Sequence, residues 1–298
     1  MDALPPLPES LPPDRRHLIT DIVTRLRTIR GVTAIVLGGS HAMGTAGAHS
    51  DIDLGVYYSD VEPFSIEEMR RVAHRIAPHN HPVVTNFHEW GPWVNGGVWL
   101  NIDSTKVDLL YRNIDQVEHT IVEAVSGVWH HDFDQLPTFG FHSVVYLAEI
   151  MGSLPLHDPH GRIAALKRQV AIYPGALKYT IVTDSLWSAE FTLLFARDFA
   201  RKRDVYNTVG CLTRIASFLT QALFALNETY FFSDKHALTV LDRLPRVPTR
   251  YKERMEDVLS GPGRTTDELT QSVEALASLW QEVKTLAADT YKPKYRTA

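Results

Sequence analysis

The sequence predicts an α+β fold with two domains: a small mixed β-sheet domain flanked by helices over residues 1–130, and an all-α helical-bundle domain over residues 131–298. First, 298 residues are enough for two domains of roughly 150 residues each. Second, short β-branched runs alternate with helical periodicity as far as residue 111, and long segments of 3.6-residue periodicity dominate beyond residue 114. Third, Pro137 and Gly140 interrupt the periodicity where the boundary is expected.

The first domain is expected to begin with a helix, a strand, a loop, a second strand and a second helix. Apolar residues recur every three or four positions over 14–30 and 65–77, which is typical of amphipathic helices. Residues 32–37 form a β-branched apolar run that ends at two glycines, and residues 51–58 alternate acidic and apolar side chains as a half-buried strand does. Further strands, separated by turn signals, are predicted at 83–87, 98–102 and 107–111.

The second domain is expected to consist of helices, because its apolar residues follow a helical period almost throughout. Helices are predicted at residues 140–152, 159–171, 175–202, 205–227, 234–243, 248–259 and 265–290.

Composition restricts the class of protein. Hydrophobic residues make up 44% and charged residues 22%, which is typical of a folded globular chain. The single cysteine, Cys211, cannot form an internal disulfide, so a reducing compartment is expected. The first residues lack the basic segment and apolar run of a signal peptide, and no stretch of about 18 uncharged apolar residues occurs. We therefore expect a cytoplasmic protein without a membrane partner.

Charge is distributed unevenly along the chain. Residues 1–150 carry 10 Lys and Arg against 19 Asp and Glu, whereas residues 151–298 carry 20 against 16. This asymmetry fits an acidic half that collects metal and a second half that handles phosphate, but it fits a merely soluble surface equally well. A pI near 6.3 without long basic runs argues against a duplex DNA partner.

Three carboxylates and a glycine pair carry the chemical signal. Asp51 and Asp53 are two residues apart on a predicted strand, so their side chains share one face, where they repel unless a cation neutralises them. Asp108, on a later strand, supplies a third carboxylate. Mg²⁺ prefers oxygen ligands and is commonly completed by substrate phosphates, so these residues predict a magnesium site.

The glycine pair predicts a phosphate site beside the carboxylates. Gly38 and Gly39 permit close approach of the backbone, and Ser40 begins a predicted short helix whose free N–H groups favour an anion. Two metal ions bound by the carboxylates can activate an attacking hydroxyl and steady a leaving pyrophosphate, with Asp108 taking the hydroxyl proton.

Gly39-Ser40, the spacer, Ser50-Asp51-Ile52-Asp53 and the later Asp108 together resemble the DNA polymerase β-type nucleotidyltransferase superfamily over about residues 31–112. Its members include aminoglycoside and lincosamide nucleotidyltransferases and minimal nucleotidyltransferases of toxin–antitoxin pairs. The resemblance implies a catalytic domain that binds an NTP, with ATP expected, and two Mg²⁺ ions. It further implies that the three aspartates hold the metal, and that Gly38, Gly39, Ser40 and Ser50 contact the nucleotide.

The acceptor stays open at this stage. The leading expectation is a hydroxyl on a small molecule such as an antibiotic, and the alternatives are tRNA, a protein side chain, or nucleotide binding without turnover. Lys178 and Lys235 are the expected triphosphate contacts from the helical half, because each is close in sequence to a tyrosine that could stack on a base or an acceptor. The histidines show no zinc-finger spacing, so zinc is not expected.

Overall fold

The computed structural model describes residues 4–47 and 50–295, and these form two compact units. Of the described residues, those up to Val122, Asp132–Gln135 and Tyr146–Ile172 form the first unit, and Glu123–His131, Leu136–Val145 and those from Tyr173 onward form the second. The predicted α+β class with a helical C-terminal region is confirmed. Residues 146–172 group with the sheet, whereas the sequence places them in the helical domain.

The first unit is built on a mixed sheet whose described strands lie in the order β3-β4-β5-β2-β1-β8. Among these described strands, only β2 and β5 pair in parallel, and the other neighbours are antiparallel. The strands are β1 (Val32–Leu37), β2 (Ile52–Tyr58), β3 (Val83–Val84), β4 (Gly97–Ile102), β5 (Thr105–Asn113) and β8 (Leu154–His157). The helices of this part of the chain are α1 (Pro13–Leu26), α2 (Gly39–Ala42), α3 (Ile66–Ile76), α4 (Ile114–Val125), α5 (Val144–Gly152) and α6 (Arg162–Val170).

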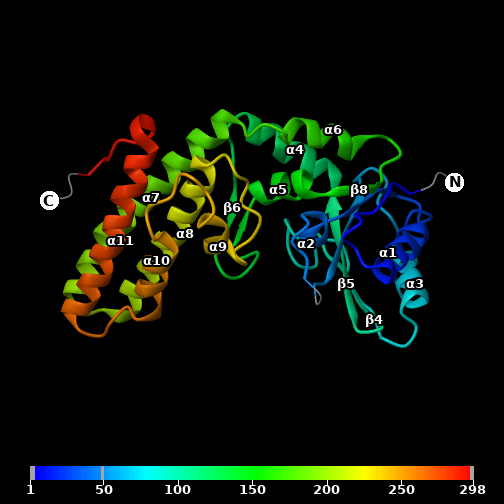
Figure 1. Ribbon diagram of the computed structural model, residues 1–298, viewed down its shortest axis with the longest axis horizontal. Coiled ribbons are helices and arrows are strands. Elements are labelled where there is room, and N and C mark those ends of the chain that lie inside the picture. Colours follow the sequence, from blue (N-terminus) through cyan, green and yellow to red (C-terminus); the bar gives the residue numbers. More distant parts are fainter. Residues whose placement is uncertain (1–3, 48–49, 296–298) are drawn as a thin grey trace. The chain divides into compact units, whose positions relative to one another are not determined.

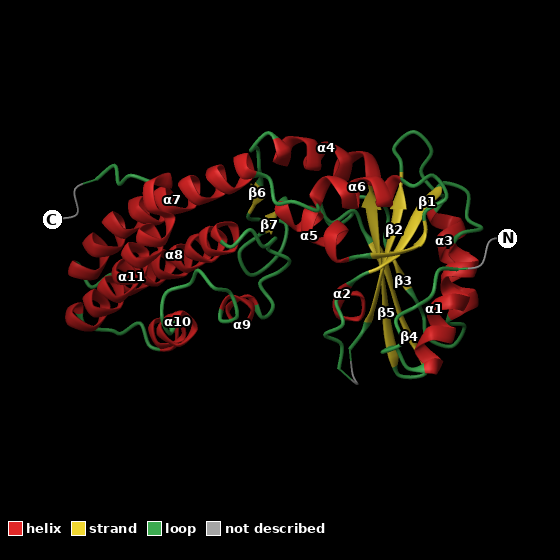
Figure 2. Cartoon of the chain, turned by 45° about the horizontal axis from the view of Figure 1, so that its top comes forward, coloured by secondary structure: helices red, strands yellow, loops and turns green. Residues whose placement is uncertain are grey.

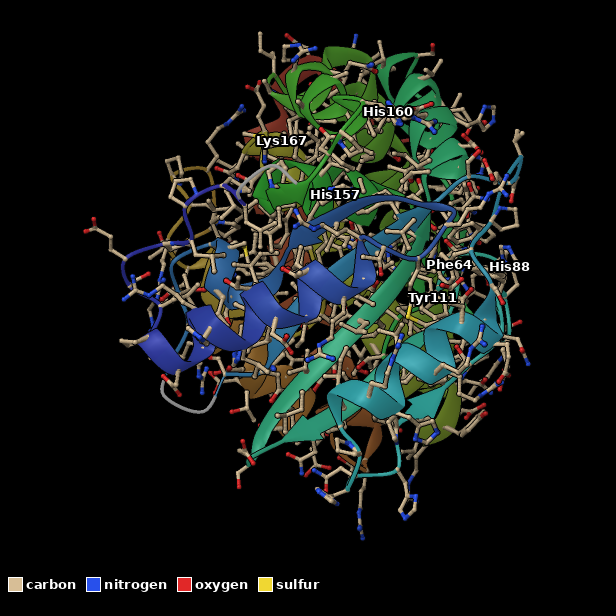
Figure 3. All side chains as sticks on the ribbon, turned by 90° about the vertical axis from the view of Figure 1, so that its right-hand side faces the viewer. Phe64, His88, Tyr111, His157, His160 and Lys167 are labelled. Carbon is tan, nitrogen blue, oxygen red and sulfur yellow. The ribbon has the colours of Figure 1, made fainter. Side chains whose placement is uncertain are left out.

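One face of the sheet forms the core of the first unit. Alternate residues such as Leu54 on β2 and Leu109 on β5 are buried against apolar residues of α1 and α3, which lie on this side of the strands (Figure 2). Phe64 and Tyr111 close one end of this core with an edge-to-face contact of 5.1 Å between ring centroids (Figure 3). Because side chains alternate along a strand, residues at the intervening positions face the opposite side.

Helix α5 covers part of the opposite face through a buried ion pair. Arg112 on β5 donates to both carboxylate oxygens of Glu149, at 2.7 and 2.6 Å, and the arginine is only 4% exposed. Lys167 on α6 caps the C-terminus of α5 by donating to the carbonyls of Ile150, Met151 and Ser153 at 2.6–3.0 Å (Figure 3 labels Lys167). These contacts hold α5 and α6 against the sheet.

Two elements of the first unit escape the sequence prediction. Helix α4 follows β5 without a break, so no turn residue marks its start. Strand β8 contains Pro155, which argues against a central strand, and it indeed lies at the sheet edge beside β1.

The predicted helix over 140–152 begins only at Val144, because Phe141–His142 forms the short strand β7, paired with β6 (His131–Asp132).

The second unit is helical, and its long helices α7 (Gly175–Arg201), α8 (Val205–Leu226) and α11 (Thr266–Ala287) pack against one another (Figure 1). Shorter elements complete it, namely α9 (Ala237–Leu241), α10 (Tyr251–Ser260) and η1 (Ala288–Thr290). Among the described residues, α8 has the length and composition of a membrane span, with a mean hydropathy of 1.5, but 67% of that window is buried in the protein. This is weak evidence for a span, because a core helix has the same character.

Candidate functional site

Two of the predicted carboxylates lie side by side on the sheet face opposite the core. Asp53 on β2 and Asp108 on β5 are partners in the parallel register, and neighbouring strands run about 4.8 Å apart. Asp51 directly precedes β2, two residues before Asp53. Their neighbours Ile52 and Leu54 are fully buried on the core face. The fold therefore brings Asp53 and Asp108 together on one side of the sheet, with Asp51 just before β2.

Two of these acids, Asp51 and Asp108, interact electrostatically. Burial, and then the negative charge of Asp51, raise the pKa of the Asp108 carboxyl above its ordinary value, with the Lys106 cation opposing them. A carboxylate with a raised pKa holds a proton more strongly and is a better general base than a solvated one. Repulsion between Asp51 and Asp108 is also the interaction that a bound cation would relieve.

Gly39 brings the backbone of the β1–α2 turn against the Asp53 carboxylate. Gly39 has a positive φ of +57°, and a Cβ placed on it would lie 1.8 Å from Oδ2 of Asp53. Gly38 donates its N–H to the carbonyl of Asp53 at 2.8 Å, but a Cβ there would meet nothing closer than 3.8 Å. Of the two glycines, Gly39 is therefore the one at which a side chain would collide with Asp53.

Ser40 and Ser50 lie at the two ends of the loop between this turn and Asp51. Ser40 is half-buried in α2, a helix of only four residues. A helix this short has a small dipole, so a phosphate would be bound mainly through close contact with the backbone at the two glycines. Ser50 accepts a hydrogen bond on its hydroxyl from the N–H of Gly47 at 2.9 Å, which closes a local turn. Nucleotide contact by either serine stays a prediction.

Arg15 and His41 hold the end of this loop in place, and no local sequence pattern predicts their contacts. Nη1 of Arg15 on α1 donates to the Ser50 carbonyl at 2.7 Å and contacts Nε2 of His41 at 2.9 Å. Because arginine can only donate, Nε2 accepts and the imidazole proton sits on Nδ1. Burial lowers the pKa of His41, so the ring is neutral at pH 7. The contacts join residues 26 and 35 positions apart, beyond the reach of local patterns.

The donor set fits a divalent cation in its chemistry. Asp53 and Asp108 share one face, and Asp51 is close enough to Asp108 to repel it, so oxygen ligands and negative charge of the kind that hard cations prefer are present. Within residues 4–47 and 50–295, no group of three or more His, Cys, Asp or Glu is placed so that it could hold a metal ion. Substrate phosphates would therefore have to complete the coordination, which is the usual situation for Mg²⁺.

The two predicted lysine contacts lie in the helical unit. Lys178 on α7 forms an ion pair with Glu228 at 2.8 Å, and Lys235 is exposed before α9. Tyr230 stacks on Tyr173 with ring centroids 4.7 Å apart, so it contributes to internal packing. Triphosphate binding by Lys178 and Lys235 stays a prediction.

Comparison with known protein families identifies a domain in the first part of the chain. Residues 19–126 match the family model of the nucleotidyltransferase domain, a segment that contains all three aspartates and the glycine turn. A solved structure of a nucleotidyltransferase-like protein from Exiguobacterium sibiricum 255-15 is similar with a TM-score of 0.45 and 8% identity, covering 90% of this chain and 74% of that one. No curated protein matches the chain in sequence.

The resemblance to the nucleotidyltransferase superfamily is thus confirmed: the chain carries a nucleotidyltransferase domain over residues 19–126.

Proposed function

We propose that this chain transfers a nucleoside monophosphate from an NTP, with ATP as donor and Mg²⁺ as cofactor, to a hydroxyl of a small molecule, and releases pyrophosphate. The observation that carries the proposal is the pairing of Asp53 and Asp108 in register, with Asp51 in electrostatic reach and Gly39 against the Asp53 carboxylate. An antibiotic of the aminoglycoside or lincosamide type is the proposed class of acceptor.

Each part of the site has a task in this reaction. The backbone at Gly38–Ser40 receives the triphosphate, because glycine leaves room for close approach. Asp51, Asp53 and Asp108 would hold Mg²⁺, which when bound neutralises phosphate charge and lowers the pKa of the acceptor hydroxyl. Arg15 and His41 position the chain that enters Asp51.

Asp108 acts as the base in the proposed transfer. The acceptor hydroxyl gives its proton to the Asp108 carboxylate, whose raised pKa suits it for this role. The hydroxyl oxygen forms a bond to the α-phosphorus. The bond between the α-phosphorus and the bridging oxygen breaks, and its electron pair leaves with pyrophosphate.

Calorimetric titration of each of the four NTPs, with and without Mg²⁺, tests the first step. We expect wild-type protein to bind one NTP in the presence of Mg²⁺, and Asp53→Ala to lose this binding while keeping its fold. Asp60→Ala, which removes an exposed acid in the loop after β2, is the matched control and should bind as wild type does. Mg²⁺-dependent affinity that survives in Asp53→Ala would overturn the site assignment.

Detection of the transferred nucleotide tests the second step. Protein incubated with the bound NTP, Mg²⁺ and kanamycin A or lincomycin is expected to release pyrophosphate and to add the mass of one nucleoside monophosphate to the acceptor. NTP binding without any transfer to small-molecule hydroxyls would instead favour a macromolecular acceptor or a binding protein without turnover.

A further inference from the structure

A tryptophan lies in the same row of the sheet as the paired carboxylates. Trp99 on β4 is the antiparallel register partner of Asp108, which is in turn the partner of Asp53. Directly opposed residues of neighbouring strands project to the same face, so the indole lies beside Asp108 on the side away from Asp53. Sequence patterns do not reveal this neighbour, because it depends on the pairing of β4 with β5.

A second tryptophan extends the first into an open aromatic wall. Trp90 stacks on Trp99 with ring centroids 4.2 Å apart and an interplanar angle of 24°, and it remains 46% exposed. The Trp99 ring also lies close to Gly97, where an added Cβ would stand 3.0 Å from the indole. Exposed, stacked indoles are uncommon on a protein surface unless something covers them.

The loop that carries Trp90 is held firmly. Gln135 donates through Nε2 to the carbonyl of Trp90 and accepts through Oε1 from the N–H of Trp93 at 2.9 Å. Gly91, at φ +105°, allows this approach, because a Cβ there would lie 2.5 Å from Oε1 of Gln135. The indole of Trp90 is therefore presented on a braced loop, as a preorganised binding surface requires.

Polar side chains border the wall in the next row. Asn101 and Lys106 are register partners on β4 and β5, both are exposed, and each lies two residues from Trp99 or Asp108 on the same face. An aromatic surface next to a few hydrogen-bonding groups suits a ligand that has both an apolar face and hydroxyls. A sugar or cyclitol ring has this combination, since its C–H groups can lie on an indole while its hydroxyls reach polar side chains.

The geometry of the transfer indicates which substrate binds beside the two indoles. This step rests on the proposed function. In an in-line transfer the attacking and leaving oxygens stand on opposite sides of the phosphorus. The Gly39 turn, which receives the triphosphate, lies on the β1 side of Asp53, whereas β4 lies beyond Asp108 on the other side. The attacking hydroxyl therefore enters from the side on which the indoles stand.

We propose that Trp90 and Trp99 form the acceptor subsite, and that the acceptor is a hydroxyl-bearing sugar or cyclitol ring stacked on the indole of Trp90 with one hydroxyl directed to Asp108.

Binding of ring probes in the absence of nucleotide tests the proposal apart from catalysis. Saturation-transfer NMR would compare kanamycin A, lincomycin, spectinomycin and methyl β-D-glucopyranoside with the open-chain polyol sorbitol. We expect at least one ring probe to bind wild-type protein and sorbitol not to bind. Trp90→Ala should weaken that probe about tenfold, in line with the loss of one ring stack, and Trp90→Phe should restore most of the affinity. Tyr206→Ala, which removes an aromatic ring that is 86% exposed on α8, is the matched control.

Titration of NTP with Mg²⁺ into the same variants separates this proposal from the proposed function. Unchanged NTP affinity in Trp90→Ala, together with weakened ring-probe binding, supports the acceptor subsite. Loss of NTP affinity in Trp90→Ala would overturn it, because the indole would then stack on the base. Failure of every ring probe to bind wild-type protein would also overturn it. Ring binding at Trp90 in a protein that binds no NTP would support the ring site and refute nucleotidyl transfer.

Discussion

Replacing Gly39 by alanine should disable the site through a displacement that can be worked out from the structure. The new Cβ would stand 1.8 Å from Oδ2 of Asp53, whereas real Cβ atoms essentially never approach a heavy atom closer than 3.0 Å. The Asp53 carboxylate or the turn must therefore move by about 1.2 Å, the difference between these two distances. Misplacement of a catalytic group by about 1 Å costs on the order of 100-fold in rate.

Gly161→Ala separates this clash from backbone strain. Gly161 has a similar φ of +66°, but a Cβ on it would meet nothing within 4 Å. Each substitution should cost about 1 to 2 kcal/mol for a left-handed alanine, so both variants should unfold at lower urea concentration than wild type. Only Gly39→Ala should also lose Mg²⁺-dependent NTP binding by calorimetry and about 100-fold in kcat/KM.

Two outcomes for these glycine variants would refute the role given to Gly39. If Gly39→Ala binds NTP and turns over as Gly161→Ala does, the contact between the turn and the Asp53 carboxylate has no role in the site. If Gly161→Ala loses NTP binding as well, the loss reflects general destabilisation of the first unit.

Two further predictions address the polar face of the sheet. The folded-state pKa of Asp108 is raised, so the stability contributed by its protonation is present in acid and is lost as the pH rises through that pKa. Asp108→Asn should therefore melt at a higher temperature than wild type at pH 7 without metal, and this difference should vanish in acid. Its turnover should fall about 10²- to 10⁴-fold. Equal melting curves at pH 7 would contradict the prediction. Arg112→Met leaves the Glu149 carboxylate without its arginine partner, so the free energy of unfolding in urea should fall by about 3 to 5 kcal/mol. The double variant Arg112→Met/Glu149→Leu should recover most of this loss. Additive losses in the double variant would show that the ion pair is not the cause.

Local patterns predict the parts of this fold that depend on neighbours in sequence. The alternation over 51–58 correctly places Asp53 on a strand with its neighbours Ile52 and Leu54 on the opposite face, although β2 begins at Ile52 and Asp51 only precedes it; the glycine pair correctly marks the turn after β1. The main helices of the second unit follow from their apolar periodicity, so α7, α8 and α11 lie close to their predicted ranges. These features need no knowledge of which strand pairs with which.

Features that depend on strand order could not be predicted in the same way. The pairing of Asp53 with Asp108 requires β5 to lie parallel beside β2, and the position of Trp99 requires the antiparallel register of β4 with β5. Strand β8 joins the sheet from outside the segment that shows strand signals, and Pro155 conceals it further. Pairing is decided by packing between distant segments, which a single sequence does not display.

One face of the sheet carries the core packing and the other carries the carboxylates, so the site can be changed without unfolding the protein. Leu54 and Leu109, fully buried on the core face, carry the packing against α1 and α3. Asp53 and Asp108 alternate with them on the opposite face, so removing a carboxylate leaves that packing in place. Like charges in this row also oppose folding in the absence of a cation. Substitution of these acids should therefore abolish ligand binding while leaving stability equal or higher, an outcome that distinguishes acids retained for binding from acids retained for structure.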